Sequence, residues 1–589
     1  MLQDARNLPD GQVLETDVCI AGAGAAGITL ALELLDSGID VVLLESGGFN
    51  DEKSTQSLYS GTVATERLHS PPDRYRQRRF GGSTTLWGGR CVPFDAIDFE
   101  TRSYLPNSGW PITREVLEPH YRRANALCEA GQFAYTTGEA FSAALQPVIR
   151  GFGSGDFSTN SLERFSCPTN FGLRYRARLA AASNVRVLLH ANIGRISLND
   201  AGTMVREVGV RTLQGKACSV RARHYVLALG GLEVPRVLLA NRDIHPTGIG
   251  NARDLVGRYY MCHIAGTVGS LQLNLPRADV SHGYDLAESG VYCRRRLALS
   301  AATQRRLGIG NFIARLHHPR ITNPDHGTGA LSLLYLAKPF IPYEYAKRLH
   351  GDETANWRTW LQHVQNVLGD PVDTAAFLWD WYRLRHLASR KFPSIIVKPK
   401  TNCFSLDFHS EQQPNFSSRV TLNGAQDALG MPQVHIDWRY TEWDIRTVRC
   451  ALNLFARDIQ ASGIGSFTYN PASLETEILR DGAYGGHHLG TARMGTDSHT
   501  SVVDGDCKIH GVQNLFVAGS ATFPTSSQAN PTLTVVALAI RLAAHLKEKI
   551  HQERQPSALH ALPPSVTPSV TPSAYRSRSN RPVDRNVPA

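Results

Sequence analysis

Three glycines near the start of the chain have the spacing that a dinucleotide-binding turn requires. Gly22, Gly24 and Gly27 lie between a short apolar run and a stretch with helical periodicity. Gly22 allows a tight turn, Gly24 lets the backbone approach a pyrophosphate, and Gly27 lets the helix and strand pack closely. The unpaired N–H groups at the start of the helix can then bind the phosphates.

An acidic residue, Glu45, completes this motif. It follows a second apolar run at 40–44, where a carboxylate can accept hydrogen bonds from ribose hydroxyls. An acid rather than an arginine disfavours a ribose 2′-phosphate, so FAD or NAD is expected rather than NADP. Glycine-rich turns without a ligand are common, but the order of strand, glycines, helix, strand and acid argues against that interpretation.

The elements that must position these residues indicate an α/β fold. A helical pattern runs from the glycines through Leu35, and another helix is predicted to begin near Pro235. Residues 265–480 have a different pattern of predicted elements, in which strand-like runs are mixed with helical stretches. Buried parallel strands are predicted at 17–20, 40–44, 185–189 and 225–229, and alternating strands at 420–422 and 434–438.

Two further segments have unusual compositions. Residues 80–90 read FGGSTTLWGGR, and glycines this dense among small hydroxyl residues suggest backbone running against a flat ligand. Residues 331–387 are rich in aromatic and aliphatic side chains, partly at helical spacing. We interpret this second segment as buried packing, with an interfacial helix as the alternative.

Length and composition are those of a globular protein. The chain has 589 residues, 42% of them hydrophobic and 19% charged, so two domains are expected, one of which can interrupt the other. The ten cysteines are scattered and form no CxxC pair, so neither a disulfide framework nor a metal site is expected. No apolar stretch is long enough to span a bilayer, and the start lacks the pattern of a signal peptide. A cytoplasmic protein is therefore expected.

Part of the formal net charge of +10 comes from two local groups of arginines. Arginines cluster just before the glycine-rich loop, where a phosphate-bearing cofactor accounts for them, and again in the C-terminal tail. A nucleic-acid partner is therefore not expected. From residue 555 onward, proline, serine and a duplicated Ser-Val-Thr-Pro predict a disordered tail at 555–589. The two arginine groups are Arg74, Arg76, Arg78 and Arg79, and Arg576, Arg578, Arg581 and Arg585.

Taken together, these segments resemble the glucose–methanol–choline (GMC) family of FAD-dependent oxidoreductases. The resemblance covers most of residues 15–550 and is strongest at 17–48, 80–94, 225–240, 414–442 and 485–545. The loop at 81–89 and the segment Asn530-Pro531-Thr532-Leu533-Thr534 are closer in texture to bacterial sugar- and pyranose-oxidising members than to the choline branch.

The resemblance implies a Rossmann-type FAD-binding domain that is discontinuous in sequence, with an inserted α+β substrate-binding domain. The FAD-binding domain would comprise residues 1–264, including a flavin-covering loop at 80–94, and residues 481–554. The substrate-binding domain would comprise residues 265–480.

The resemblance also implies the residues that contact the cofactor. In relatives that oxidise pyranoses, a histidine of the glycine-rich loop can bond covalently to the flavin. The equivalent here is Leu86, which has no nucleophile, so FAD is predicted to be held non-covalently. The expected cofactor contacts are Gly22, Gly24, Ala26, Gly27, Glu45, Gly82, Ser83, the backbone of Ile193, Gly519, Ser520, Pro531 and Thr532.

Two residues near the C-terminus carry the implied chemistry. His487 aligns with the family's catalytic histidine, and imidazole suits a general base because it titrates near neutral pH. Asn530 aligns with the second catalytic position and would hydrogen-bond the substrate oxygen. If this alignment is off by one residue, His488 rather than His487 occupies the catalytic position. A lone histidine is usually a satisfied core residue, but the surrounding Gly-Gly-His-His-Leu-Gly-Thr favours the functional interpretation.

Asn530 also has a structural interpretation. It precedes Pro531 and a helical run through Leu546, and is therefore predicted to be an N-cap with proline at the first helical position. A helix that starts there would direct its positive end at the pyrimidine ring of a flavin.

The implied function is oxidation of an alcohol group, on a sugar or polyol-like substrate, by hydride transfer to flavin N5. An FAD-containing lyase and a non-catalytic binding protein of the same fold are the alternatives, and a nicotinamide dehydrogenase is less favoured. The electron acceptor (oxygen, a quinone or a protein) and the oligomeric state stay open. Side chains of 265–480 would select the substrate, and that selection does not follow from the fold.

Overall fold

One end of the molecule is organised by an eight-stranded sheet assembled from distant parts of the chain. The computed structural model describes residues 1–340, 356–394, 396–397, 399, 401–480 and 482–555. The sheet has the order β1-β8-β3-β2-β11-β10-β9, and β22 pairs with β11. Its strands are β1 (Leu2–Asp4), β2 (Gln12–Ala21), β3 (Val41–Leu44), β8 (Val185–Leu189), β9 (Asn192–Leu198), β10 (Val205–Arg211), β11 (Ala217–Leu227) and β22 (Leu515–Val517).

The central strands of this sheet are parallel. β2 pairs in parallel with β3 and β11, β3 with β8, and β11 with β22. The four apolar runs predicted as buried parallel strands all overlap these strands, although the runs at 40–44 and 225–229 extend one and two residues beyond β3 and β11, and this confirms the α/β class. The C-terminal segment joins the same sheet through β22, so residues near 515 lie beside residues near 225.

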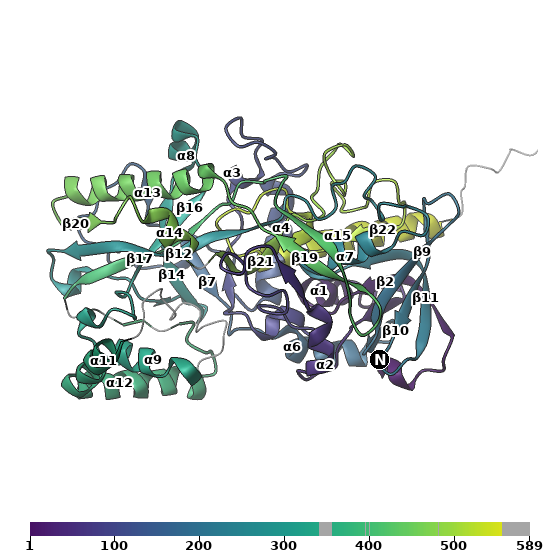
Figure 1. Cartoon of the computed structure of the whole chain (residues 1–589), viewed down its shortest axis with the longest axis horizontal. Helices are drawn as coiled ribbons and strands as arrows, with labels where there is room; N and C mark the ends of the chain where they lie inside the picture. Colours follow the sequence, from purple (N-terminus) through teal and green to yellow (C-terminus); the bar gives the residue numbers. More distant parts are fainter. Residues whose placement is uncertain (341–355, 395, 398, 400, 481, 556–589) are drawn as a thin grey trace, which may run out of the picture.

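Helices flank this sheet and orient the turns at its edge. The long helix α15 (Thr532–Arg554), yellow in Figure 1, packs against α1 (Ala25–Glu33) and α4 (Arg114–Leu127). The other helices of this half are α2 (Lys53–Gln56), α3 (Ala96–Phe99), α5 (Thr137–Ala140), α6 (Phe171–Ala181) and α7 (Gly230–Ala240). Both predicted terminal helices are confirmed, although α1 ends two residues before Leu35 and α15 continues past Leu546.

The helix predicted near Pro235 begins five residues earlier, at Gly230, so that prediction is wrong about the boundary. Pro235 lies inside α7 and has no N–H to donate to the carbonyl of Gly231. The hydroxyl of Thr491 donates a hydrogen bond to that carbonyl at 2.7 Å. A side chain from a distant segment thus satisfies the carbonyl that the proline leaves unpaired.

The other end of the molecule contains a seven-stranded antiparallel sheet of order β20-β12-β17-β16-β15-β6, in which β21 also pairs with β12. Helix α13 (Glu442–Ala461) lies on one side of it in Figure 1. Two of its strands, β6 and β21, come from outside residues 265–480. The strands are β6 (Phe157–Ser158), β12 (Met261–Leu273), β15 (Leu297–Leu299), β16 (Phe312–His317), β17 (Cys403–Ser410), β20 (Gly465–Thr468) and β21 (Ala483–Leu489).

Two smaller sheets connect the halves. One has the order β13-β14-β7-β5 and the other β18-β19-β4. The alternating runs predicted at 420–422 and 434–438 pair antiparallel as β18 and β19. The remaining elements are β4 (Gly61–Val63), β5 (Arg90–Cys91), β7 (Leu162–Phe165), β13 (Asp285–Leu286), β14 (Tyr292–Arg295), β18 (Arg419–Gln426), β19 (Pro432–Asp437), α8 (Ala301–Leu307) and α14 (Leu474–Leu479).

A group of three helices lies on the opposite side of the seven-stranded sheet from α13 (Figure 1). These are α9 (Gly329–Leu336), α11 (Trp357–Gly369) and α12 (Pro371–Tyr382). The prediction of buried packing over 331–387 is wrong for α11 and α12, whereas Leu331 and Tyr335 of α9 are buried. His363 and Thr374 are the buried residues of α11 and α12, because these helices pack mainly against α9 and leave much of their circumference uncovered.

Among the described residues, no helix is long and apolar enough to cross a membrane. The tail predicted to be disordered lies outside the described residues, apart from residue 555.

Candidate active site

A cavity of about 1190 Å³ is lined by residues of both large sheets and of the turns at their edges. The cavity is larger than most single-ligand pockets, and its volume suits a dinucleotide and a substrate together. Of the fourteen residues predicted from the sequence, only Gly27 does not line it. Gly27 has the packing role predicted for it, since a Cβ there would lie 1.8 Å from the carbonyl oxygen of Gly22.

The turn between β2 and α1 presents bare backbone to the cavity. Gly22 has φ +102°, and an added Cβ would lie 2.6 Å from the carbonyl oxygen of Ala228, so only glycine fits. Gly24 occupies the N-cap of α1, where no side chain caps the helix. A Cβ on Gly24 would meet no atom within 4 Å. Gly24 therefore borders open space at the positive end of a helix, as a pyrophosphate site requires.

The carboxylate of Glu45 is held in place by this turn. Its oxygens accept hydrogen bonds from the backbone N–H groups of Ala23 at 3.0 Å and Gly47 at 2.9 Å. Burial raises the pKa of Glu45, against the effect of these N–H groups. The carboxylate lines the cavity with lone pairs left for the ribose hydroxyls it is predicted to bind.

The glycine-rich loop crosses directly over the β2–α1 turn. The N–H of Gly81 donates to the carbonyl of Ala23 at 2.8 Å. A Cβ on Gly82 would lie 2.9 Å from the Cα of Gly24. Ser83 and Leu86 line the cavity, and a Cβ on Gly88 would project into open space. The backbone exposed by this loop and by Gly24 fits a flat cofactor such as FAD.

The arginines before this loop are partly neutralised by an acid that sequence reasoning missed. Arg76, Arg78 and Arg236 each approach the carboxylate of Glu233, all at 3.1 Å. Burial would raise the pKa of Glu233, but these three cations hold it at about 2. Arg236 also pairs with Asp427 at 2.6 Å. These three arginines and two acids together retain a net positive charge, consistent with a phosphate-bearing ligand nearby.

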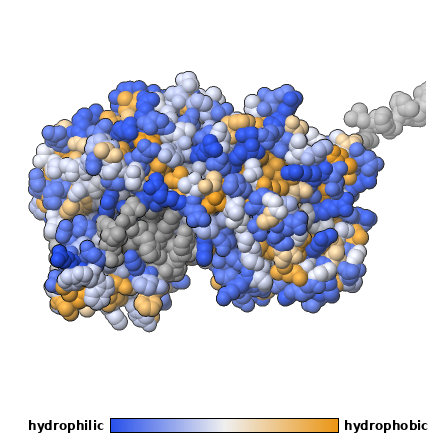
Figure 2. Space-filling view, in the orientation of Figure 1, coloured by the Kyte–Doolittle hydropathy of each residue, from blue (hydrophilic) through white to orange (hydrophobic). Residues whose placement is uncertain are grey.

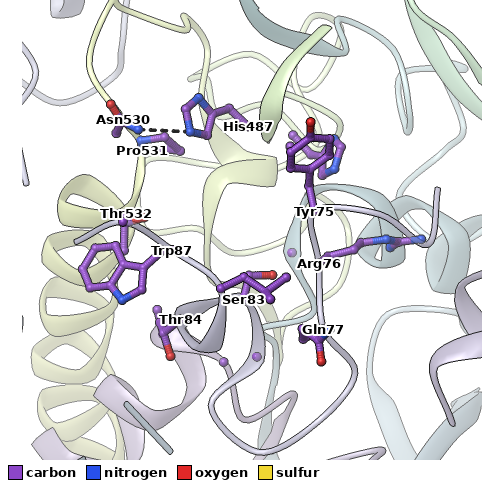
Figure 3. Close-up of a pocket in the computed structure, with 18 of the residues that line it drawn as sticks. Tyr75, Arg76, Gln77, Ser83, Thr84, Trp87, His487, Asn530, Pro531 and Thr532 are labelled. Atoms are coloured by element: carbon purple, nitrogen blue, oxygen red, sulfur yellow. Dashed lines mark hydrogen bonds between the residues drawn. The ribbon is translucent and has the colours of Figure 1, made fainter. Parts of the chain in front are cut away.

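His487 and Asn530 lie within hydrogen-bonding distance of each other. His487 is on β21 and Asn530 directly precedes Pro531 at the start of α15, with His487 Nε2 at 3.1 Å from Asn530 Nδ2. Figure 3 shows the pair on one side of the cavity and Ser83 and Thr84 on the other.

A third residue, His263 of β12, contacts the other ring nitrogen of His487. An amide nitrogen can only donate, so His487 Nε2 is the acceptor of the Asn530 hydrogen bond and the proton of His487 is on Nδ1. That Nδ1 lies 2.8 Å from Nδ1 of His263. His263 is fully buried, and burial lowers its pKa to about 4. His263 is therefore neutral near pH 7 and accepts the Nδ1 proton of its neighbour.

His488 belongs to a different cluster. Its Nδ1 lies 2.6 Å from the hydroxyl of Tyr260, which also lies 2.8 Å from Nε2 of His69. Burial holds the pKa of His488 well below its usual range. Neighbouring residues of a strand point in opposite directions, and here His487, rather than His488, is the residue that contacts Asn530.

The prediction that Asn530 caps α15 is wrong. The helix begins at Thr532, Pro531 is in the cap position, and no side chain caps it. The amide of Asn530 contacts His487 instead. Since Pro531 and Thr532 line the cavity, the uncapped, positive start of α15 borders the same space as the histidine.

Basic and neutral polar groups line the cavity beside this pair. Arg90 Nη1 lies 3.4 Å from Nε2 of His409, and Arg90 Nε lies 3.5 Å from a carboxylate oxygen of Glu163. Burial and the charge of Arg315 lower the pKa of Arg90 to about 10. The ring of His409 lies 6.5 Å from that of His487. Arg90 comes from β5 and His409 from β17, and neither was predicted from the sequence as a site residue.

The outer part of the cavity is apolar. Its walls come from α9 and α12 and from the loops beside them, where Arg320 and Arg385 lie among apolar side chains. The apolar residues are Ile321, Leu333, Leu334, Ala337, Phe377, Leu378, Trp381 and Pro393.

Two family models match the chain. One, described as GMC oxidoreductase, matches residues 414–539, and the other, described as FAD dependent oxidoreductase, matches residues 17–333. The two matched segments include the β2–α1 turn, the glycine-rich loop, His487 and Asn530.

Characterised relatives cover nearly the whole chain at low identity. The 2-methyl-1,2-propanediol dehydrogenase of Mycolicibacterium austroafricanum is 23% identical over 92% of this chain and 98% of its own. The 6'''-hydroxyparomomycin C oxidase of Streptomyces lividus is 24% identical over 90% of this chain and 92% of its own. Pyridoxine 4-oxidase from Mesorbium loti has a similar fold, with a TM-score of 0.50, 18% identity, and coverage of 90% of this chain and 99% of that one.

Proposed function

The chain belongs to the GMC family of FAD-dependent oxidoreductases, and from this premise we propose that His487 and Asn530 are its catalytic residues. The enzyme oxidises an alcohol group to a carbonyl. We propose that His487 is the base that removes the hydroxyl proton and that the substrate is a sugar or polyol-like molecule. The observation that carries the proposal is the contact between His487 Nε2 and Asn530 at the cavity wall.

The two side chains can bind a hydroxyl group in complementary ways. A substrate hydroxyl that enters between the two side chains would replace their mutual hydrogen bond. The lone pair of His487 Nε2 then accepts the hydroxyl proton, and the freed amide of Asn530 donates a hydrogen bond to the oxygen as it becomes alkoxide-like. Bound FAD supplies the acceptor for the hydride that leaves carbon. The uncapped start of α15 contributes a positive potential at the same wall.

His263 acts as a positioning residue for this base. By accepting the Nδ1 proton of His487, it keeps Nε2 unprotonated and directed at Asn530. A neutral, buried acceptor serves this purpose without placing a competing charge beside the base.

The cofactor contacts are proposed at the residues named from the sequence, with Gly24 and the start of α1 at the pyrophosphate and Glu45 at the ribose. We propose that FAD is held non-covalently, because Leu86 offers no nucleophile. Acid precipitation of the protein should then release all of the flavin into the supernatant. Flavin that stays in the precipitate would contradict non-covalent binding.

The substrate class is supported by the relatives and by the polar wall. The names of the two relatives describe hydroxyl-bearing substrates, a diol and a hydroxyparomomycin. Arg90 and His409 lie near the proposed base and can bind further hydroxyls of the same molecule.

Anaerobic titration of the flavin absorbance tests the proposal. The wild-type enzyme should lose its absorbance near 450 nm when one of a panel of sugars and polyols is added, and His487→Ala should lose it far more slowly. An enzyme that turns over an alcohol-derived substrate without any bleaching, yet bleaches with dithionite, would instead support the lyase alternative. Readmission of air then shows whether oxygen accepts the electrons.

A further inference from the structure

The helices α11 and α12 expose an unusual concentration of large apolar side chains. Of the nineteen exposed large hydrophobic residues in the described chain, eleven lie between 340 and 387, including every exposed tryptophan. Trp357 is 70% exposed, Val372 78% and Trp379 62%. We call this surface the aromatic patch, defined as Trp357, Trp360, Leu361, Leu368, Val372, Leu378, Trp379, Trp381, Tyr382 and Leu387. Figure 2 shows hydrophobic surface gathered where α11 and α12 lie, at the lower left.

We propose that the aromatic patch docks on the surface of an anionic lipid bilayer. A concentration of exposed apolar side chains on two neighbouring helices indicates a protein or membrane contact rather than a surface that faces only water. The helices contain 13 and 12 residues, which is too short to cross a bilayer but suits helices that lie in its interface. Tryptophan and tyrosine favour that interface, because their rings are apolar and each has a polar group.

The charges around the patch are complementary to anionic lipid. In residues 329–340 and 356–394 there are six basic residues and three acidic ones, and one of the acids, Asp370, is buried. A symmetric dimer formed through the same patch would bring these cations together, whereas anionic headgroups would neutralise them. Four of the six basic residues, Lys338, Arg358, Arg383 and Lys391, remain for headgroups, and Arg383 also pairs with Asp380 at 3.1 Å. The other two, Arg385 and Arg390, donate hydrogen bonds to backbone carbonyls instead.

The relation between the patch and the cavity also favours a lipid surface. Leu378 and Trp381 belong to the patch and also line the cavity that contains His487 and Asn530. A folded partner protein seated on the patch would cover this apolar part of the cavity. A bilayer at the same place would only adjoin it. The docking itself does not depend on the chemistry proposed at His487.

Vesicle flotation with the FAD-loaded, full-length protein tests the proposal. We expect flotation with vesicles that contain about one third phosphatidylserine in phosphatidylcholine, weaker flotation with phosphatidylcholine alone, and release as salt is raised. The triple variant Trp357→Ser, Trp360→Ser, Trp379→Ser should bind at least about tenfold more weakly. The double variant Arg358→Glu, Arg383→Glu should lose most of the preference for anionic vesicles.

A matched control separates the patch from general surface hydrophobicity. Leu173 and Leu286 are exposed leucines outside the patch, at 75% and 59%, and their replacement by serine should leave flotation unchanged. Unchanged flavin absorbance in every variant shows that the fold is intact. The proposal is overturned if wild-type protein does not float with anionic vesicles at low salt, or if the tryptophan variant floats equally well. It is also overturned if the patch proves to hold two copies of the chain together, with no vesicle binding.

Discussion

Replacing His263 by leucine should slow flavin reduction without removing the flavin. The substitution takes away the acceptor for the Nδ1 proton of His487, which now lies 2.8 Å away. A buried donor left without a partner costs about 1–3 kcal/mol. If that cost falls on the transition state, the rate constant for reduction by alcohol should drop by about 5- to 150-fold.

Two amide substitutions at the same position make this prediction specific. In His263→Asn the amide oxygen takes the place of the ring Nδ1 and can accept the same proton, so most of the rate should return. In His263→Gln the amide lies nearer the place of Nε2, so the rate should remain low. Both variants remove the imidazole and keep a polar side chain, so a general loss of packing would affect them alike.

Stopped-flow absorbance under anaerobic conditions measures the effect directly. The three variants should keep the wild-type flavin content and the wild-type rate of reduction by dithionite. Reduction by alcohol should be fastest in the asparagine variant and slower in the glutamine and leucine variants. The reasoning is refuted if His263→Leu is reduced by alcohol at the wild-type rate, or if the asparagine variant is as slow as the leucine variant.

Three further predictions follow from single contacts. Gly24→Val should fold but bind little FAD, because its side chain would enter the open space at the pyrophosphate position. The ratio of flavin to protein absorbance measures the FAD content, and a variant with full FAD occupancy would contradict the prediction. Thr491→Val should lower the unfolding free energy by about 1–3 kcal/mol, since the Gly231 carbonyl loses its donor, and denaturant titration checks it against Thr491→Ser, which keeps the hydroxyl. The pKa of His263 falls from 6.5 to about 4 on folding, so the unfolded chain gains a proton first as the pH drops. The unfolding free energy should therefore fall by about 3 kcal/mol between pH 6.5 and pH 4. His263→Asn should remove this part of the dependence of the unfolding free energy on pH.

Features with a local backbone requirement could be predicted from the sequence. The positions of Gly22, Gly24 and Glu45 follow from the spacing of one turn, and the structure brings all three to the cavity. The buried parallel strands were likewise visible as apolar runs. His487 and Asn530 were identified from a family resemblance, and the structure places their side chains in contact.

Features that depend on long-range pairing could not be predicted. His263 contacts His487 because β12 pairs with β21, more than two hundred residues away, and nothing near residue 263 marks that pairing. The start of α7 was misplaced because a hydroxyl from residue 491 compensates for Pro235. The exposure of Trp357 and Trp379 was missed because composition alone does not show whether another element covers an apolar helix.

The central claim, that His487 is the base, is tested most directly by the anaerobic rate of flavin reduction in His487→Ala with a substrate that bleaches the wild type. The account predicts a rate constant lower by about two to four orders of magnitude, with the flavin still bound and still reduced by dithionite. A variant that is reduced by the alcohol as fast as the wild type would contradict the assignment.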